Sequence, residues 1–332
     1  MAKMKRPKTN PEILVIGAGM SGLCAASVLK ESGCAVRVLD KGRGVGGRMA
    51  TRRIGEATWD HGAQFATTRD PNFEKLLHRA HLAGTAVAWS RGFGSDKDSH
   101  VRWRGQTGMA ALAKQVAIGL EISLEKQVTS INVSGNRWMV FTSDGTEWSA
   151  DGVVLTAPVP QSLALLRAGG VCLEPTLERN LEAIRYERCL ALLALLDAPS
   201  RLPAPGALSL PSGPIAWIAD NQMKGISREP TLTIHATASY SDTHWDRDRD
   251  ATAHELLDAA RMWIGADVKN AHIHGWRYSK PCKTEPFPYA LVSAAPPLLL
   301  AGDAFGGPRV EGAALSGWAA AEALLRFAST GN

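Results

Sequence analysis

Apolar and polar positions near the beginning of the chain predict a strand, a helix and a second strand in turn. Residues 13–16 form an apolar run that stops at Gly17, and a helical pattern follows over 21–32 and stops at Gly33. A second apolar strand is expected over 35–39. A strand, a helix and a strand within about 30 residues have the size of a parallel βαβ unit.

The rest of the chain is predicted to mix helices with short strands. Residues 42–53 and 90–100 are expected to be loops, and the proline-rich stretch 199–214 an irregular connector. Helices are expected at 72–83, 109–118, 251–263 and 312–327. Strands are expected at 123–124, 128–131, 138–142, 152–156, 231–238 and 298–301, with a hairpin turn at Asp144-Gly145.

Composition is that of a globular protein. The 332 residues suggest two domains at roughly 100–200 residues each. A hydrophobic share of 45% with 21% charged residues argues against disorder. The 32 glycines among 332 residues exceed the usual share of about 7%, and the motifs below account for part of this excess.

Charge and cysteine content limit which kinds of ligand and which cellular compartment are expected. A net charge of +5 is compatible with an anionic ligand and too weak to indicate nucleic acid. Five cysteines without CxxC spacing argue against a disulfide framework or a zinc site, so the cytoplasm is expected. The basic start and apolar stretch 13–29 resemble a signal peptide, but glycines interrupt the stretch and no A-x-A pattern follows. No membrane span is expected, because the longest other apolar run, 189–196, is too short.

The first motif with chemical content is Gly17-x-Gly19-x-x-Gly22, between the expected strand and helix. Such glycines allow a tight turn, close approach of a pyrophosphate and close packing of the helix on the sheet. The helix N-terminus then offers free N–H groups to an anion. Asp40 lies 18 residues beyond Gly22, at the end of the second strand, where it can accept hydrogen bonds from ribose hydroxyls. The motif predicts a dinucleotide site, with a glycine-rich packing contact as the alternative.

A glycine- and arginine-rich segment, GRGVGGR at 42–48, follows that acid directly. Its glycines and guanidinium groups can surround a second side of a pyrophosphate through charge-assisted hydrogen bonds. A solvated basic loop is the alternative, as is a nucleic-acid contact through Arg48, Arg52 and Arg53. Aromatic residues that would stack on bases do not interleave with these arginines, which disfavours the nucleic-acid contact.

Two further segments could border a flat ring. DHGAQF at 60–65 places small residues beside an amide, where the backbone could approach a ring closely. Gly302-Asp303 follows the last expected strand, and RVEGA at 309–313 begins the last helix, whose N–H groups could face an anionic ring edge. A turn and a small-residue core helix are the alternatives. His272 and His274 alternate on one strand face, but without a third ligand nearby no metal site is expected.

Together these segments resemble the FAD-dependent amine oxidase superfamily, and most closely its renalase-like flavoproteins. The resemblance implies an α/β protein with a discontinuous Rossmann-type FAD-binding domain and a second, α+β substrate domain built on an antiparallel sheet. The first domain is expected to comprise residues 10–70, 102–165 and 282–330, and the second residues 71–101 and 166–281.

The resemblance also implies non-covalent FAD and assigns residues to it. The expected cofactor-binding residues are Gly17, Gly19, Met20, Ser21, Gly22, Asp40, Lys41, Arg43, Gly47, Arg48, Gly62, Ala63, Gln64, Phe65, Val128, Asp303, Val310, Gly312 and Ala313. The expected substrate-pocket residues are Thr67, Arg69, Asp70, Trp217, Asn221, His235 and Arg309. No side chain is assigned as a catalytic acid or base, because the flavin itself carries the chemistry.

Two departures from the family pattern bear on the substrate. Amine oxidases usually carry a tyrosine just before the terminal EGA, where this chain has Arg309-Val310. An aromatic face favours an amine cation, whereas a guanidinium repels a cation and attracts phosphate or carboxylate. Renalase-like sequences tend to carry two aromatic residues after the glutamine, where this chain has Phe65-Ala66, which would widen the pocket.

The expected function is that of an FAD-dependent oxidase. A small reduced substrate delivers hydride to flavin N5, and O₂ reoxidises the flavin to give H₂O₂. By resemblance the substrate is an isomeric dihydronicotinamide dinucleotide, 2- or 6-dihydro-NAD(P), which is anionic. The alternatives are a flavin amine oxidase or desaturase acting on another small substrate, and a non-catalytic flavin-binding protein. A monomer or a homodimer is expected, with no nucleic-acid partner.

Overall fold

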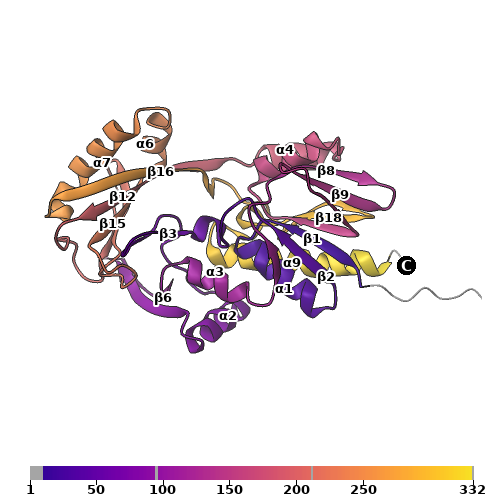
Figure 1. The fold of residues 1–332 in the computed structure, drawn as a ribbon, viewed down its shortest axis with the longest axis horizontal. Helices are drawn as coiled ribbons and strands as arrows, with labels where there is room; N and C mark the ends of the chain where they lie inside the picture. The colour runs from indigo at the N-terminus through magenta and orange to yellow at the C-terminus, as the bar shows by residue number, and fades with distance from the viewer. Residues whose placement is uncertain (1–9, 94–95, 211, 331–332) are drawn as a thin grey trace, which may run out of the picture.

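The computed structural model describes residues 10–93, 96–210 and 212–330. Two large sheets lie toward opposite ends of an elongated molecule (Figure 1). One draws its strands from the beginning, the middle and the end of the chain, and the other draws them from residues 186–281. The architecture is mixed α/β, with a largely parallel sheet and a separate antiparallel sheet, as the family resemblance implied.

The first sheet has six strands, of which only the edge strand β17 runs antiparallel to its neighbour. Across the sheet the strands are β17 (Ala290–Ala294), β18 (Pro297–Leu300), β11 (Gly152–Leu155), β1 (Glu12–Ile16), β2 (Ala35–Leu39) and β7 (Glu121–Ser123). The helices that pack on one face are α1 (Met20–Glu31), α3 (Ala110–Val116) and α9 (Val310–Thr330).

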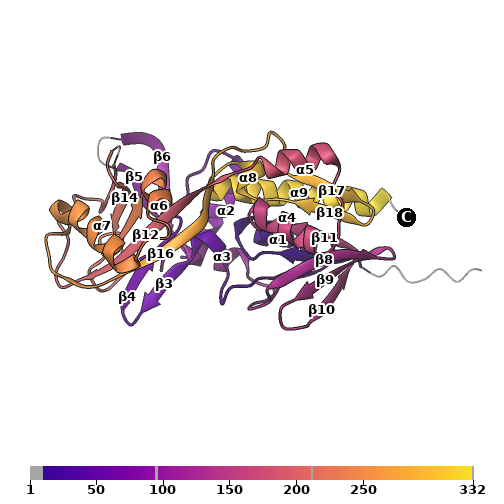
Figure 2. The same ribbon diagram turned by 90° about the horizontal axis from the view of Figure 1, so that it is seen from above.

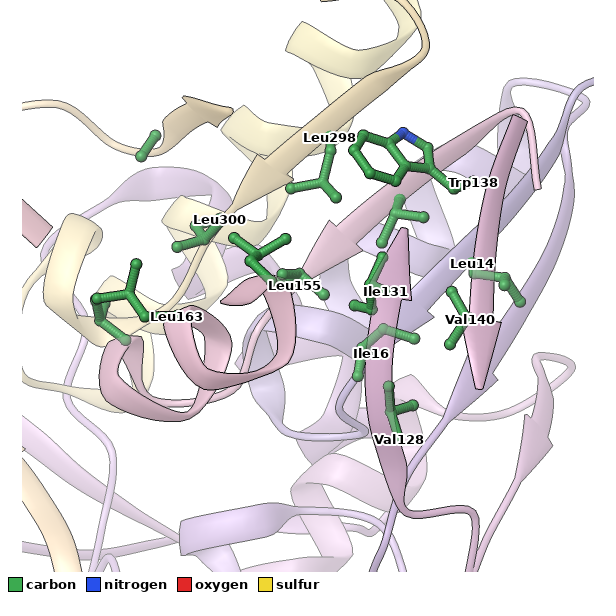
Figure 3. Packing of buried hydrophobic residues seen from close by; sticks show 14 of the residues in the cluster. Leu14, Ile16, Val128, Ile131, Trp138, Val140, Leu155, Leu163, Leu298 and Leu300 are labelled. Carbon is green, nitrogen blue, oxygen red and sulfur yellow. The ribbon is translucent and has the colours of Figure 1, made fainter. Parts of the chain in front are cut away.

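Both faces of this sheet are covered, which explains why its central strands are apolar throughout. Ile13 and Val15 of β1 pack with α1, α3 and α9. Leu14 and Ile16 point to the other face and join a cluster with Trp138 (Figure 3). Burial on two faces requires an uninterrupted apolar run rather than an alternating one. The elements on this second face are β8 (Val128–Ser134), β9 (Arg137–Thr142), β10 (Glu147–Ala150), α4 (Val159–Ala168) and α5 (Pro175–Glu182).

The second sheet has five antiparallel strands. In order they are β13 (Ala207–Ser209), β14 (Ile215–Asp220), β15 (Thr231–Ala236), β12 (Tyr186–Leu196) and β16 (Val268–Pro281). Helices α6 (Ala238–Thr243) and α7 (Arg249–Ile264) cover one face, where Leu190 and Leu192 pack with Trp245. The other face meets a hairpin of β3 (Thr51–Ile54) and β4 (Ala57–Asp60) (Figure 2). Leu193 packs against Trp59 at this contact.

Short elements link the two sheets. They are η1 (Gly47–Met49), a 3₁₀ turn, α2 (Pro71–Leu82), the ribbon of β5 (Ala86–Phe93) and β6 (Asp96–Gly105), and α8 (Asp303–Gly306). No helix of the described residues is long and apolar enough to cross a bilayer.

The expected strand–helix–strand unit is confirmed as β1, α1 and β2, with β1 parallel to β2. The other expected strands and helices also correspond to observed elements. The loop expected at 90–100 is wrong, because these residues belong to β5 and β6, with 94–95 outside the described residues. The ribbon is polar in sequence, but Trp89 and Phe93 pack against the distant Trp217. Local composition does not reveal such a contact.

Two other expected loops contain regular structure. Residues 51–54 form β3, which pairs with β4, and 207–209 form β13 inside the proline-rich connector, of which residue 211 is outside the described part. Each short strand gains its backbone hydrogen bonds from a partner strand rather than from a local pattern. Strand β6 also runs through the expected domain boundary between 101 and 102.

Candidate functional site

A cavity of about 500 Å³ lies where the two sheets approach each other. Its walls include residues one to three positions after the ends of β1, β11 and β18, so it borders the carboxyl ends of three parallel strands. Open α/β sheets bind their ligands outside these ends. The lining residues are Gly19, Met20, Ser21, Gly46, Arg48, Met49, Gly62, Ala63, Gln64, Phe65, Ala66, Thr67, Thr156, Cys189, Trp217, His235, Trp276, Ser279, Gly302, Asp303, Pro308, Arg309, Val310 and Ala313.

The N-terminus of α1 forms one wall. Gly19 caps the helix without a side-chain hydrogen bond, so the first N–H groups are left for a ligand. The hydroxyl of Ser21 is buried and has no hydrogen-bond partner among the described residues. A buried polar atom without a partner is costly unless a bound group completes it. This end of the cavity therefore suits an anion.

Asp40 joins the two glycine-rich segments. Its carboxylate accepts hydrogen bonds from the backbone N–H groups of Ala18 and Gly42, both at 2.6 Å. A carboxylate has about four acceptor positions, so it can still accept from a bound ribose. Asp40 therefore fixes the β1–α1 turn relative to the loop that follows β2.

Arg48 and Asp303 both line the cavity and form a bidentate ion pair. Nη1 and Nη2 of Arg48 donate to the two carboxylate oxygens of Asp303 at 2.6 and 2.8 Å. Nη1 also donates to the carbonyl oxygen of Ser279 at 3.2 Å. Burial alone would lower the pKa of Arg48, but the adjacent Asp303 carboxylate outweighs it and raises the pKa. Two residues separately assigned to FAD are thus partners of each other.

The segment after β4 follows a tightly defined path. A Cβ on Gly62 would lie 1.9 Å from the carbonyl oxygen of Arg48, so only glycine fits. The N–H of Ala63 donates to that same oxygen at 2.9 Å. Nε2 of Gln64 donates to the carbonyl oxygens of Asp60 and Gly62, at 2.6 and 3.1 Å. Backbone and amide are therefore held against the cavity.

The wall beside this segment is built from rings that share one carbonyl as hydrogen-bond acceptor. Trp276 Nε1 and His235 Nε2 approach the carbonyl oxygen of His61 at 2.8 and 3.1 Å. Because a carbonyl only accepts, His235 carries its proton on Nε2. Burial lowers the pKa of both His61 and His235 to about 4. Both rings are therefore neutral at pH 7.

These two histidines predict a loss of stability in mild acid. In the unfolded chain a histidine binds a proton below about pH 6.5, whereas the folded rings resist protonation until about pH 4. The unfolded state then binds more protons, so the free energy of unfolding falls as pH drops from 6.5 to 4, by up to about 3 kcal/mol per ring. Urea unfolding at pH 7.0 and 4.5 measures this. His235→Asn keeps an N–H donor, so its pH dependence should be weaker; an unchanged dependence would contradict the assignment.

The head of α9 forms the remaining wall. The carboxylate of Glu311, which is buried, accepts from the backbone N–H groups of Arg69 and Asp70 at 2.6 and 2.7 Å. The side chain of Asp70 caps α2 by accepting from Asn72 and Phe73 N–H groups. The backbones of Arg69 and Asp70 thus hold α9 in place, and neither residue lines the cavity expected to be their substrate pocket.

The structure brings together most of the expected site residues. The expected cofactor residues in the cavity wall are Gly19, Met20, Ser21, Arg48, Gly62, Ala63, Gln64, Phe65, Asp303, Val310 and Ala313, and the expected substrate residues there are Thr67, Trp217, His235 and Arg309. Outside the wall lie Gly17, Gly22, Asp40, Lys41, Arg43, Gly47, Val128 and Gly312.

Asn221 is also outside the wall. Its side chain is buried and bonded to the backbone N–H of Asp60 and to Thr231 and Thr233, so it supports the scaffold. Sequence reasoning missed Trp276, Cys189 and Thr156 in the wall. Trp276 continues the alternation of His272 and His274, which could have revealed it.

Comparison with known proteins shows which families and folds this chain is similar to. A family model described as "Flavin containing amine oxidoreductase" matches residues 85–325, and one described as "NAD(P)-binding Rossmann-like domain" matches residues 15–80. Renalase of Mus musculus is 28% identical over 293 residues, which cover 81% of this chain and 84% of that protein. Acetone monooxygenase (methyl acetate-forming) of Gordonia sp. (strain TY-5) is 29% identical over 158 residues, 46% of this chain and 27% of that one. A structure of wild-type putrescine oxidase bound to putrescine has a TM-score of 0.69 at 14% identity, covering 96% of this chain and all of that chain.

Proposed function

Because the chain belongs to the flavin-containing amine oxidoreductase family and is similar to renalase, we propose that it is an FAD-dependent oxidase of the renalase type. In this proposal the substrate is a small, reduced and anionic molecule, of which an isomeric dihydronicotinamide dinucleotide is the first candidate. The observation that carries the choice of an anion is Arg309. Its guanidinium is exposed at the cavity wall and forms no salt bridge with a described residue.

One unpartnered polar group in the cavity wall is what makes the cavity suitable for FAD. The buried hydroxyl of Ser21 lacks a partner among the described residues and lies at the N-terminus of α1, where a pyrophosphate would supply acceptors. Arg48 lines the same cavity, and Asp40 holds the turn that leads into α1 through the N–H of Ala18. When bound, FAD supplies the hydride acceptor and passes electron pairs to O₂, giving H₂O₂.

In this proposal the protein's own residues bind the cofactor, orient the substrate and exclude water from the site. The N-terminus of α9 at Val310 presents free N–H groups and the positive end of the helix dipole to an anionic ring edge. Phe65, Trp217 and Trp276 add apolar surface to the cavity wall. The buried indole N–H of Trp217 has no partner among the described residues and suits an acceptor on the bound substrate.

The test is the absorbance spectrum of the purified protein, followed by anaerobic mixing with 6-dihydro-NAD. We expect visible flavin bands, bleaching by the dinucleotide, and H₂O₂ once air is admitted. A protein that takes up no FAD overturns the cofactor assignment. Bleaching by an amine such as putrescine alone would support an amine oxidase instead, and a flavin that no reduced substrate bleaches would support a non-catalytic flavin-binding protein.

Arg309→Met is expected to weaken binding of the anionic substrate. An exposed guanidinium–phosphate contact contributes about 1–1.5 kcal/mol, so KM for a phosphate-bearing substrate should rise about 10-fold with kcat within a factor of two. Steady-state H₂O₂ production at 0.15 M salt measures it. Arg261→Met removes the same charge from α7, where its side chain is 81% exposed, and should leave KM unchanged. An equal rise in KM for a substrate without phosphate would contradict a charge contact.

A further inference from the structure

Lys224 and Asp60 form an ion pair in which neither side chain is exposed to solvent. The Nζ of Lys224 lies 2.7 Å from Oδ2 of Asp60. Lys224 comes from the loop after β14 of the antiparallel sheet, and Asp60 ends β4, so the pair joins two distant parts of the chain. The ring of Trp89 closes another side of the ammonium group, at 4.9 Å from its centroid.

Asp60 is held on every polar atom. Its Oδ1 accepts from the Thr51 hydroxyl at 2.6 Å and from the N–H of Met109, just before α3, at 2.8 Å. Its own N–H donates to Oδ1 of Asn221 at 3.4 Å. The carboxylate therefore has a single orientation, and so does the ammonium group that it binds.

Gln64 connects this pair to the cavity. Its Nε2 donates to the carbonyl oxygen of Asp60, and its Oε1 accepts from Nζ of Lys224 at 3.5 Å. The ammonium group has donors only, so it fixes which end of the amide faces it. Gln64 lines the cavity on its other side, within the segment expected to border the flavin ring.

Stability alone is a weak reason for such a pair. Desolvating two charges offsets much of their attraction, and well-packed apolar residues of similar volume often serve a fold equally well. Burial lowers the pKa of Lys224, with the Asp60 carboxylate opposing that shift. This buried pair is bonded to the cavity-lining amide of Gln64, and holding that amide in one orientation explains the pair better than stability does.

We propose that Lys224 and Asp60 are positioning residues that act through Gln64. The pair fixes the direction of the Gln64 amide and thereby the wall formed by residues 62–65, against which the substrate and the flavin ring are aligned. The inference rests on the proposed function for its catalytic consequence. The orientation of the amide is a property of the protein alone.

The test compares Lys224→Met/Asp60→Asn, Gln64→Met and the variant that combines all three changes. The double change removes both charges together, which avoids the unpaired buried carboxylate that Lys224→Met alone would leave. The matched control is Lys126→Met/Asp144→Asn, which removes a pair of the same types whose side chains are 28% and 42% exposed. Anaerobic stopped-flow then measures the rate of flavin reduction by substrate in each variant.

We expect the double variant and Gln64→Met each to reduce flavin about 10-fold more slowly than the wild type, and the combined variant to be no slower than Gln64→Met. The control should match the wild type. Effects that multiply to about 100-fold in the combined variant would show that the pair does not act through Gln64. A wild-type rate in the double variant overturns the proposal as well.

A second measurement does not depend on catalysis. Hydrogen exchange of the Gln64 side-chain NH₂, followed by NMR in FAD-free protein, should be at least 10-fold faster in the double variant than in the wild type. The Gln64→Met spectrum identifies the signal. Equal exchange rates overturn the positioning role. If the wild type instead binds no flavin but protects this amide, the proposed function fails while the positioning role stands.

Discussion

Replacing Gly22 by alanine is expected to abolish stable FAD binding. A Cβ at this position would lie 1.9 Å from the carbonyl oxygen of Gly17 and 2.9 Å from Oγ1 of Thr156. The Gly17 oxygen belongs to the backbone of the β1–α1 turn, and Thr156 directly follows β11. Neither can yield, so α1 must move away from the sheet. Its N–H groups and Ser21 then leave the anion end of the cavity. We expect the Kd for FAD to rise at least about 100-fold, close to 3 kcal/mol, by fluorescence titration of apoprotein.

Two other glycine variants separate crowding from cofactor contact. Gly44→Ala adds a methyl group to the second glycine-rich segment with no heavy atom within 4 Å, so the free energy of unfolding should not change. Gly19→Ala also meets no protein atom within 4 Å, but Gly19 lines the cavity. Its methyl group should leave the free energy of unfolding unchanged and weaken FAD binding about 10-fold. Normal FAD affinity in Gly22→Ala would contradict the role of this turn.

Local signals account for what the sequence predicted well. The spacing of Gly17, Gly19 and Gly22 is set by one turn, and the flanking strand and helix show their own periodicity. The unit β1–α1–β2 therefore follows from about 30 consecutive residues. The same reasoning fails for the β5–β6 ribbon, whose Trp89 and Phe93 gain their burial from Trp217 more than 100 residues away. Nonlocal burial of this kind leaves no local periodicity.

In the candidate site, too, residues in local motifs were predicted and residues paired over long sequence distances were not. Most residues assigned to the cofactor lie in short motifs, and these motifs bring many of them into one cavity wall. Asp70 has the pattern of a helix cap, and in the structure it caps α2. Lys224 follows β14 in a loop with no recognisable motif, and its partner Asp60 is 164 residues away. A buried ion pair requires the tertiary structure to be seen, because either residue alone resembles a surface charge.

The pair formed by Arg48 and Asp303 could not be predicted from local patterns either, because the two residues are 255 positions apart. Each belongs to a segment assigned to FAD, and neither segment contains a pattern that predicts a bond between the two residues. Their pairing changes the interpretation of both residues. Arg48 joins the loop after β2 to the residue that begins α8, so the two ends of the chain meet at the cavity through one guanidinium.

Arg48→Met is therefore expected to lower both stability and cofactor affinity. It leaves the Asp303 carboxylate, whose side chain is 10% exposed, without its bidentate partner. Removing one member of a fully buried pair costs about 3–5 kcal/mol, and the Arg48 side chain is 29% exposed, so the free energy of unfolding measured in urea should fall by about 2–4 kcal/mol. Arg228→Met breaks an exposed pair with Glu56, whose side chains are 78% and 59% exposed, and should cost under about 1 kcal/mol.

The double variant Arg48→Met/Asp303→Asn separates the two roles of this pair. Removing both charges should recover most of the lost stability, because no uncompensated buried carboxylate remains. FAD binding should stay weak, since the cavity wall has lost a guanidinium that can reach the cofactor's anionic part. Recovery of both properties would assign the pair to the scaffold alone. Recovery of neither would mean that the bidentate geometry itself, rather than charge balance, joins the two ends of the chain.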